Sequence, residues 1–197
     1  MLRIGVSVEG ATEREFVSLV LAPYFLNKNK FLQPVDMRGN VSLDKIRTEL
    51  KPMLSSFDYT TTLYDFYGFK NRAGKSISEL EDAIFDLVPS NKKNCFIPYV
   101  QLYEFEALLF STIDAMPEYF LEPSKAESVR AILSACGNPE AINDGYETCP
   151  SRRVSGLFPE FDKKLDGPMI CGEIGLDKIR EACPRFDSWL TKLEDIS

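Results

Sequence analysis

The chain has 197 residues, 44% of them hydrophobic and 12% aromatic, a composition that suits one globular domain and excludes a disordered, collagen-like or coiled-coil chain. Thirty acidic against 23 basic residues leave a formal charge of −7, which argues against a broad basic face for phosphates. The absence of histidine excludes Ser-His and Cys-His catalysis and histidine-ligated metal hydrolases. Any chemistry must therefore use carboxylates, Lys, Arg, Tyr, Ser or Cys.

Cysteine spacing and apolar runs indicate the compartment. The five cysteines are too widely spaced for a Cys-x-x-Cys pair, so neither a disulfide framework nor a zinc ribbon is encoded. Glu9 interrupts the apolar start of the chain before it is long enough for a secretory signal, and no apolar run reaches the roughly eighteen residues of a membrane span. We therefore expect a soluble, cytoplasmic protein with no membrane partner.

The first half of the chain alternates strand-like and helix-like segments. Strands are predicted over 2–8, 34–37, 59–64 and 94–102, and helices over 13–26, 43–55 and 76–87. Thr12 is the expected N-cap of the first helix, and Pro98 indicates an edge position or a bulge in the fourth strand. This alternation predicts an α/β fold with a mostly parallel four-stranded sheet flanked by helices, whose ligands bind beyond the carboxyl ends of the strands.

The second half of the chain carries only short helical signals. They cover residues 107–110, 124–134, 151–158, 175–180 and 186–193. Because no internal repeat or Gly/Ser-rich linker is present, an independent second domain is not indicated. We predict a core over residues 1–110 and a helical extension over residues 111–197, packed together as a single structural unit.

Acidic side chains collect where the predicted strands end. Glu9 follows the first strand, Asp65 follows the third, Glu104 and Glu106 follow the fourth, and Glu13 lies one helical turn beyond Glu9. Since the carboxyl ends of parallel strands meet at one edge, we expect these carboxylates to crowd one cleft and to need a hard divalent cation. Each acid taken alone is better explained as a surface charge, whereas Glu9 together with Asp65 favours a metal site. The sequence therefore predicts Mg²⁺ or Mn²⁺ held by these five acids, with Glu9, Asp65 and Glu13 as the catalytic set.

The basic and aromatic candidates carry a weaker signal. Arg152 and Arg153 at a possible helix start, and Lys75 in a basic loop after the third strand, are the expected substrate ligands, with solvated surface as the alternative. Lys163 and Lys164 follow the two arginines and are less favoured. Aromatic residues between 64 and 110 suit base stacking, but filling of the core explains them better. The Gly-Lys-Ser at 74–76 lacks the first glycine of a phosphate-binding loop, so no intrinsic ATPase is predicted.

Several segments of the chain resemble a known family. Val8-Glu9-Gly10-Ala11-Thr12-Glu13, directly after the first strand, resembles the opening motif of Toprim domains, and Asp65-Phe66-Tyr67-Gly68 resembles their second acidic motif. Further matching segments cover 101–110, 150–153, 166–168, 173–176 and 184–186. Together they look like a Toprim-like bacterial family catalogued as a domain of unknown function, DUF4276, over nearly the whole chain.

The resemblance implies a Mg²⁺-dependent Toprim-like sheet, as in topoisomerases, primases and the overcoming-lysogenisation-defect nucleases, with Glu9 and Asp65 as metal ligands. The spacing of Glu9 and Glu13 is closer to the nuclease branch. The chain departs from the pattern at Tyr67, where a second acid is expected, and Glu104 or Glu106 is the candidate replacement.

The function predicted from these observations is Mg²⁺-dependent phosphodiester hydrolysis of a nucleic acid, DNA or RNA, with water as the nucleophile. The related nucleases imply a role in bacterial defence beside a separately encoded ATPase, and a homo-oligomer is compatible with this role. Two alternatives stay open. One is a noncatalytic metal-binding or regulatory subunit in which Tyr67 marks lost catalysis, and the other is a primase-like nucleotidyl transferase.

Overall fold

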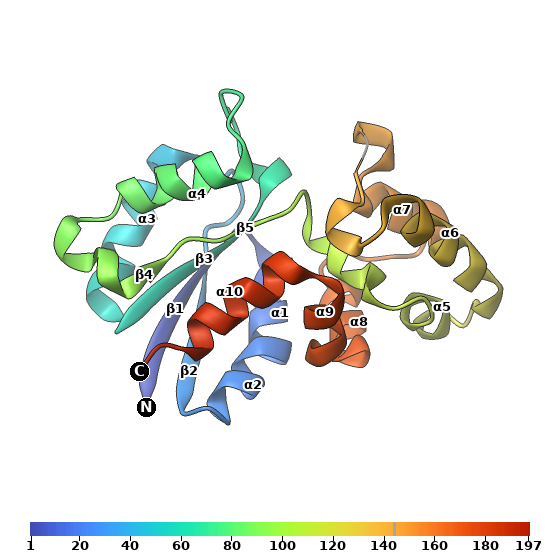
Figure 1. The fold of residues 1–197 in the computed structure, drawn as a ribbon, viewed down its shortest axis with the longest axis horizontal. Helices are drawn as coiled ribbons and strands as arrows, with labels where there is room; N and C mark the ends of the chain where they lie inside the picture. Colours follow the sequence, from blue (N-terminus) through green and yellow to red (C-terminus); the bar gives the residue numbers. More distant parts are fainter. Residues whose placement is uncertain (144) are drawn as a thin grey trace.

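A parallel sheet lies at the centre of the computed structural model, which describes residues 1–143 and 145–197 (Figure 1). The strands are β1 (Leu2–Val8), β2 (Lys30–Asp36), β3 (Tyr59–Asp65), β4 (Phe96–Ile97) and β5 (Val100–Gln101). Their order is β2-β1-β3-β4, β5 also pairs with β3, and every pairing is parallel. The prediction of an α/β fold with a mostly parallel sheet is confirmed.

The predicted fourth strand is divided into β4 and β5 at the edge of the sheet. Pro98 has no backbone N–H, so the ladder with β3 is interrupted there. The Thr62 hydroxyl fills the gap, because it accepts a hydrogen bond from the Tyr99 N–H and donates one to the Tyr99 carbonyl, both at 2.8 Å. The position of Pro98 in an edge strand agrees with the expectation from the sequence.

The first two connections differ in detail from the predicted bounds. The first helix is continuous through α1 (Ala11–Phe16), the π-helical turn η1 (Val17–Leu21) and α2 (Ala22–Leu26). Its N-cap is Gly10, so the assignment of Thr12 as the cap was wrong. Thr12 is instead buried in the first helical turn, because the chain turns immediately after Glu9. Strand β2 starts at Lys30, four residues before the predicted start at residue 34.

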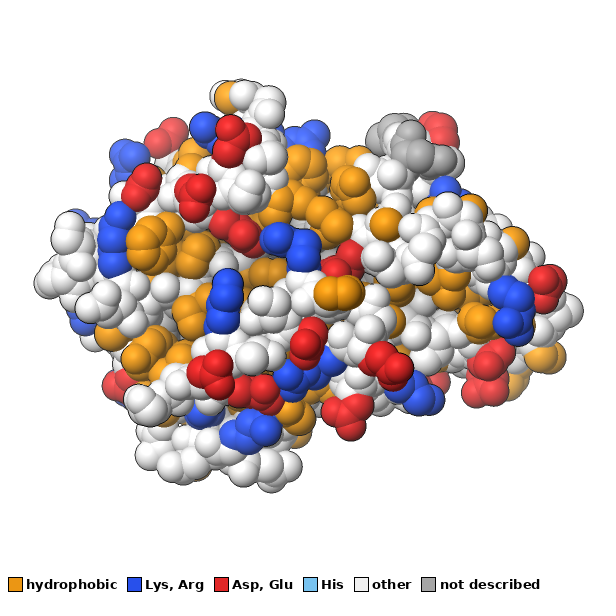
Figure 2. All heavy atoms as spheres, viewed as in Figure 1, with side chains coloured by type: hydrophobic (Ala, Val, Ile, Leu, Met, Phe, Trp, Pro, Cys, Tyr) orange, Lys and Arg blue, Asp and Glu red, His pale blue; other side chains and the backbone are white. Residues whose placement is uncertain are grey.

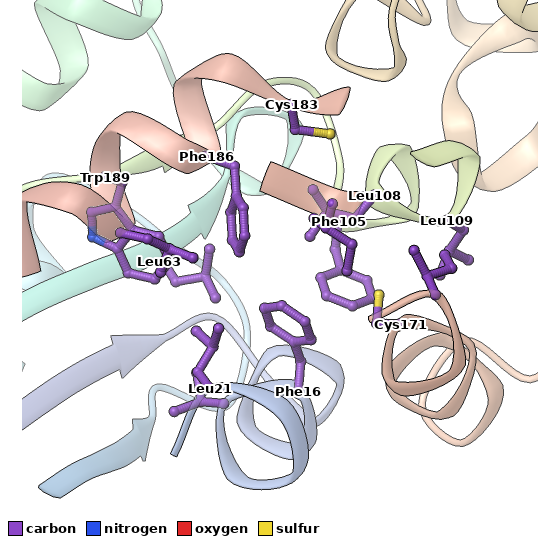
Figure 3. Close-up of a cluster of buried hydrophobic side chains, with 14 of the residues drawn as sticks. Phe16, Leu21, Leu63, Phe105, Leu108, Leu109, Cys171, Cys183, Phe186 and Trp189 are labelled. Carbon is purple, nitrogen blue, oxygen red and sulfur yellow. The ribbon is translucent and has the colours of Figure 1, made fainter. Parts of the chain in front are cut away.

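Helices cover both faces of the sheet. Helices α3 (Leu43–Ser56) and α4 (Ile77–Asp86) lie on one face, while α1, η1, α2 and α10 (Pro184–Glu194) lie on the other (Figure 1). The alternation of a strand explains this division, since Leu63 belongs to the hydrophobic cluster on the α10 face and Tyr64 to the cluster on the α3 face. In the larger cluster, Phe16 packs edge-on against Phe105 at a centroid distance of 5.2 Å (Figure 3).

The second half of the chain is helical. Its helices are η4 (Phe105–Ser111), α5 (Ala115–Tyr119), α6 (Ala126–Cys136), α7 (Pro150–Leu157), α8 (Asp166–Ile174) and α9 (Leu176–Ala182). Short 3₁₀ turns occur in both halves of the chain. Those in the first half are η2 (Phe66–Gly68) and η3 (Ser90–Cys95), and those in the second half are η5 (Pro123–Lys125), η6 (Pro139–Ala141) and η7 (Tyr146–Thr148). Helices α5 and α8 were not predicted, because α5 has a single turn and α8 opens with Gly and Pro, residues typical of turns.

Helix α10 returns to the sheet, while α5, α6 and α7 gather at the far end of the molecule (Figure 1). The Trp189 indole N–H of α10 donates to the Thr61 hydroxyl of β3 at 2.8 Å, and the indole stacks on Tyr99 at 4.7 Å. One hydrophobic cluster therefore contains residues from both 1–110 and 111–197, while a boundary at residue 110 stays a prediction. Within the described part of the chain, no helix has the length and apolar character to cross a membrane.

Candidate metal centre

The carboxyl ends of β1 and β3 bring Glu9 and Asp65 to the same edge of the sheet. The two strands are neighbours, and Val8 pairs with Leu63, so both acids leave the sheet at nearly the same level. The turn after β3 packs directly on the Glu9 carboxylate, because a Cβ at Gly68 would lie 1.9 Å from Glu9 Oε2. Only glycine fits at position 68 while the Glu9 side chain keeps this position.

Two further acids complete a carboxylate cluster, a name used here for Glu9, Glu13, Asp65 and Glu106. Glu13 on α1 is only 3% exposed, and its Oε2 accepts a hydrogen bond from the Gly10 N–H at 3.0 Å. Glu106 on η4 is fully buried. The charge of Glu13 acts on both Glu9 and Asp65, and that of Glu106 does so too, which places the four carboxylates in one electrostatic neighbourhood.

Lys163 is the basic residue of this neighbourhood. Its Nζ lies 2.9 Å from Glu106 Oε1 and 3.6 Å from Asp65 Oδ2, while its side chain is 42% exposed. Lys163 lies just before α8, which packs against α1 with Gly167 at the contact. A Cβ at Gly167 would lie 3.1 Å from the Phe105 ring and 3.7 Å from the Thr12 methyl group. The close approach of these helices thus delivers an ammonium group to the carboxylates.

Burial shifts the pKa of the acids upward. Burial, and then the charge of Glu13, raise the pKa of Glu9 to about 7, although Lys163 opposes the change. Burial raises the pKa of Asp65 well above its usual range and also raises that of Glu106, in both cases against Lys163. Burial lowers the pKa of Lys163, but Asp65 and Glu106 outweigh it and hold this pKa above its usual value. The single ammonium group of Lys163 therefore does not balance the negative charge of the four carboxylates.

The donors of the cluster fit a hard divalent cation in their chemistry. Glu9 Oε2 and Asp65 Oδ1 are buried oxygens without a hydrogen-bond partner. Over residues 1–143 and 145–197, however, no three Asp, Glu or Cys side chains are already arranged around a single point for a metal. Four carboxylates with one ammonium supply the oxygen ligands and the excess negative charge that Mg²⁺ or Mn²⁺ prefers. Completing a coordination sphere requires a shift of Lys163 or of a carboxylate.

Glu104 does not join the cluster. Its backbone is extended, and its Oε2 accepts a hydrogen bond from the Ser151 N–H at the start of α7, at 2.9 Å. Glu106, within η4, turns to Lys163 instead. Of the two acids proposed to stand in for the missing ligand at Tyr67, the structure brings Glu106 to Glu9 and Asp65, and directs Glu104 toward α7.

Glu104 instead lines a cavity of about 620 Å³. The lining residues are Tyr67, Arg72, Glu104, Cys149, Ser151 and Arg152. We call this space the aromatic cavity. Arg152, one of the predicted substrate ligands, therefore lines a cavity next to the carboxylate cluster, and it also lies 3.7 Å from the exposed Glu147 carboxylate.

The other predicted substrate ligands have different surroundings. Arg153 Nε donates to the Thr148 carbonyl at 2.6 Å, so this side chain supports the turn before α7. Lys75 lines a separate cavity of about 300 Å³, together with Arg47, Lys70 and Arg72. We call this second space the basic cavity.

Sequence reasoning missed two contributors to the site. Lys163 was set aside with Lys164 as solvated surface, and no local pattern distinguishes the two lysines. Gly68 was named only within the segment that resembles the second acidic motif, without a role in the site, and its contact with Glu9 depends on the pairing of β1 with β3. A signal for Gly68 existed, since a glycine close after a strand that ends in an acid is consistent with close backbone approach.

Comparison with known proteins identifies the family. The sequence matches the model described as "Domain of unknown function (DUF4276)" over residues 8–194, and the chain belongs to this family. A search of curated proteins finds no match.

Solved structures share the fold. The C-terminal region of the Burkholderia pseudomallei OLD protein is similar with a TM-score of 0.51 and 14% identity, over 96% of this chain and 99% of that one. The C-terminal region of the Xanthomonas campestris pv. campestris OLD protein gives a TM-score of 0.47 and 11% identity, over 96% and 97%. The family match and the fold shared with the first structure agree with the Toprim-like relation expected from the motifs.

Proposed function

We propose that the protein hydrolyses phosphodiester bonds of a nucleic acid at the carboxylate cluster, with Mg²⁺ or Mn²⁺ as cofactor. The observation that carries this proposal is the excess of buried negative charge, four carboxylates against one ammonium, with unpartnered oxygens on Glu9 and Asp65. The motifs that resemble Toprim-like nucleases and the fold shared with an OLD protein region support this reaction class.

The residues of the cluster have distinct roles in this proposal. Glu9 and Asp65 are the first metal ligands because each has a buried oxygen without a partner. Glu106 becomes available as a ligand when Lys163 moves aside, whereas Glu13 keeps its hydrogen bond to the Gly10 N–H and adds negative charge. A divalent ion, when bound, polarises a phosphodiester and lowers the pKa of an attacking water.

The protein's own groups hold the site ready for the cation. Lys163 compensates Asp65 and Glu106, which limits the repulsion among the carboxylates. The backbone of Gly68 closes over the Glu9 carboxylate and restricts its movement. The tight packing of this glycine keeps the Glu9 side chain directed to the strand edge where Asp65 ends.

The test is cleavage of plasmid, single-stranded DNA and tRNA by purified protein in Mn²⁺ and in EDTA. We expect cutting in Mn²⁺ only, and Glu9→Gln should reduce it by at least roughly a hundredfold, since even the loss of a residue that only hydrogen-bonds to a metal ligand costs about 10–100-fold. Glu127→Gln, which removes an exposed acid on α6, is the matched control and should cut normally. Absence of cutting on every substrate, with no Mn²⁺-dependent rise in melting temperature, would contradict the proposal.

One observation favours a second candidate function, a noncatalytic metal-binding or regulatory subunit. Lys163 lies between Asp65 and Glu106, and no three carboxylates in the described residues are ready to ligate one ion. The same experiment separates the candidates. A rise in melting temperature with Mn²⁺ that Glu9→Gln abolishes, without cutting of any substrate, would favour the noncatalytic subunit.

A further inference from the structure

The aromatic cavity lies beside the carboxylate cluster. Tyr67 follows Asp65 by two residues, and Glu104 precedes Glu106 by two, so two walls of the cavity are direct extensions of the segments that carry the cluster. Its volume of about 620 Å³ falls within the range of roughly 300–1,000 Å³ that is typical of sites for small organic groups. A group held in the cavity is therefore next to the proposed reaction centre.

Two aromatic rings pack against Tyr67, which is the aromatic residue among those that line the cavity. The Tyr67 ring lies 5.6 Å from the Tyr103 ring and 5.9 Å from the Phe66 ring. All three rings are half-buried, whereas most of the other aromatics considered for stacking, including Tyr64 and Phe105, are buried in the core. The explanation of core filling therefore holds for the buried aromatics and in part for Phe66, which packs against the cluster on the α3 face, but not for Tyr67 and Tyr103.

The backbone and hydrogen bonds hold this aromatic group in place. Tyr103 adopts a φ of 62°, a left-handed conformation that is uncommon for a residue other than glycine. Its carbonyl accepts the Tyr67 N–H at 3.0 Å, which ties η2 to the segment before η4. The Tyr67 hydroxyl accepts a hydrogen bond from the Asn143 side-chain amide. The ring is thus oriented from both ends, which reduces the entropy cost of stacking a planar ligand against it.

Positive charge extends from the aromatic cavity to the basic cavity. The Arg72 guanidinium lies 4.4 Å from the Phe66 ring centroid and 5.2 Å from that of Tyr67, and it lines both cavities. Arg47, Lys70 and Lys75 line the basic cavity, where Asp44 is the acid among the lining residues. On the face drawn in Figure 2 basic and acidic side chains are interspersed, whereas the charged side chains that line the basic cavity are four basic ones, Arg47, Lys70, Arg72 and Lys75, and Asp44.

We infer that the aromatic cavity binds an unstacked nucleobase of a single-stranded nucleic-acid segment, with the neighbouring phosphates on Arg72 and the basic cavity. A flat base matches the face of Tyr67, and stacking on an aromatic side chain tolerates any base. A base within a duplex is already stacked and paired, so the cavity selects single strands, loops or frayed ends. This inference rests on the proposed function for its choice of nucleic acid, and it adds the class of substrate.

The test measures binding without cleavage. Anisotropy of a fluorescein-labelled 12-nucleotide single-stranded DNA, in EDTA, gives the Kd for wild-type protein and variants. Tyr67→Leu should weaken binding by roughly 5- to 150-fold, which corresponds to the ~1–3 kcal/mol of one stacked base. Tyr67→Phe keeps the ring and loses only the hydrogen bond from Asn143, so its Kd should lie much closer to that of wild type than to that of Tyr67→Leu. Phe31→Leu, an exposed aromatic at the opposite end of the sheet, is the matched control and should bind normally.

A second arm changes the DNA and leaves the protein intact, so it does not depend on the folding of a variant. An analogue of the same 12-mer in which every nucleotide is abasic should bind wild-type protein more weakly than the intact strand, and this difference should shrink in Tyr67→Leu. The same 12-mer as a blunt duplex should bind more weakly than the single strand. Equal binding of wild type and Tyr67→Leu, equal binding of the intact and the abasic strand by wild type, or preference for the duplex would each overturn the inference.

The outcome is separable from that of the proposed function. If the protein cuts nucleic acid in Mn²⁺ but Tyr67→Leu binds and cuts single strands as wild type does, the base site is wrong and the hydrolysis stands. If Tyr67 controls binding of the single strand while no substrate is cut, the base site stands and the hydrolysis is wrong.

Discussion

Two charged clusters in this molecule treat their acids in opposite ways. At the carboxyl edge of the sheet, burial raises the pKa of Glu9 to about 7. Where α10 meets α2 and β2, hydrogen bonds from Arg180 lower the pKa of Glu194 to about 2. Arg180 Nη1 lies 2.8 Å from Glu194 Oε1, and Lys28 Nζ lies 3.3 Å from the same oxygen. The carboxylate cluster has too few cationic side chains to balance its acids, whereas the cluster around Glu194 has enough.

The difference separates a structural cluster from one that is suited to binding. Around Glu194 the charges are paired within the chain, so ionisation of this acid stabilises the fold. In the carboxylate cluster one ammonium, that of Lys163, compensates two of four acids directly, and burial raises the pKa of Glu9 and of Asp65, so that ionisation of these two acids opposes folding. A fold that retains such a charge excess gains stability from an external cation, which supports the proposed metal site.

Among the substitutions that test this comparison, Lys163→Met is expected to change the free energy of unfolding most. Removing the ammonium leaves the buried Asp65 and Glu106 carboxylates uncompensated, and because Lys163 is partly exposed the loss should be about 2–3 kcal/mol, below the usual range for a buried pair. Urea denaturation at pH 8 measures it. Adding Asp65→Asn should recover part of the loss, and the exposed neighbour Lys164→Met should change stability by less than about 0.5 kcal/mol. Equal losses for the two lysines would show that Lys163 does not compensate the cluster.

The second-largest effect is expected from Glu9→Gln, which should raise the free energy of unfolding when no metal is added. The pKa of Glu9 rises on folding from its ordinary 4.5 to about 7, so the folded protein holds the proton more tightly than the unfolded chain does. Ionised Glu9 therefore costs stability above pH 7, and the cost fades as the pH falls toward 4.5. Glu9→Gln should be more stable than wild type by on the order of 2 kcal/mol at pH 8 and by little at pH 4.5. A loss of stability at pH 8 would refute the charge excess.

The smallest effect is expected from Glu194→Gln, with the opposite sign. The pKa of Glu194 falls on folding from 4.5 to about 2, so its ionised form stabilises the fold above pH 4.5, and this contribution is lost as the pH falls through 2. Since the cluster is partly solvated, the variant should lose only about 1 kcal/mol at pH 7. Thermal unfolding from pH 3 to 8 measures it, with Glu127→Gln as the control for an exposed ion pair. A gain of stability at pH 7 would remove the contrast between the clusters.

Local sequence patterns predicted the strands and helices correctly where the hydrophobic periodicity is strong. The first and third strands, and the three helices predicted in the first half of the chain, begin and end within two residues of the predicted bounds. Ser42 and Ser76 explain the agreement for α3 and α4, because each hydroxyl accepts a backbone N–H of the first helical turn. Helix α8 was missed because its Gly167 and Pro168 favour turns locally, and the helix forms where the Phe105 ring leaves little room for a side chain at position 167.

The sequence predicted the candidate site only in part, because local patterns do not encode contacts between distant segments of the chain. The acids at the ends of β1 and β3 follow from strand alternation alone, since parallel strands must end at one edge. The choice between Glu104 and Glu106 depended on where η4 begins, and 3₁₀ turns carry a weak sequence signal. Lys163 reaches the cluster across 57 positions in sequence from Glu106, through the docking of α8 on α1, which no local pattern encodes.

The sequence by itself determined a parallel α/β sheet, the absence of imidazole chemistry, and the position of Glu9 and Asp65 beyond the strands. The composition gives the absence of histidine. Hydrophobic periodicity and strand direction give the other two features, because both depend on residues that are close together in the sequence. Only the tertiary structure decided that Lys163 compensates the cluster, that Gly68 closes on Glu9, and that Tyr67 faces a cavity. Those features depend on distances between segments far apart in the chain, which are set by packing in the core and by the pairing of buried charges.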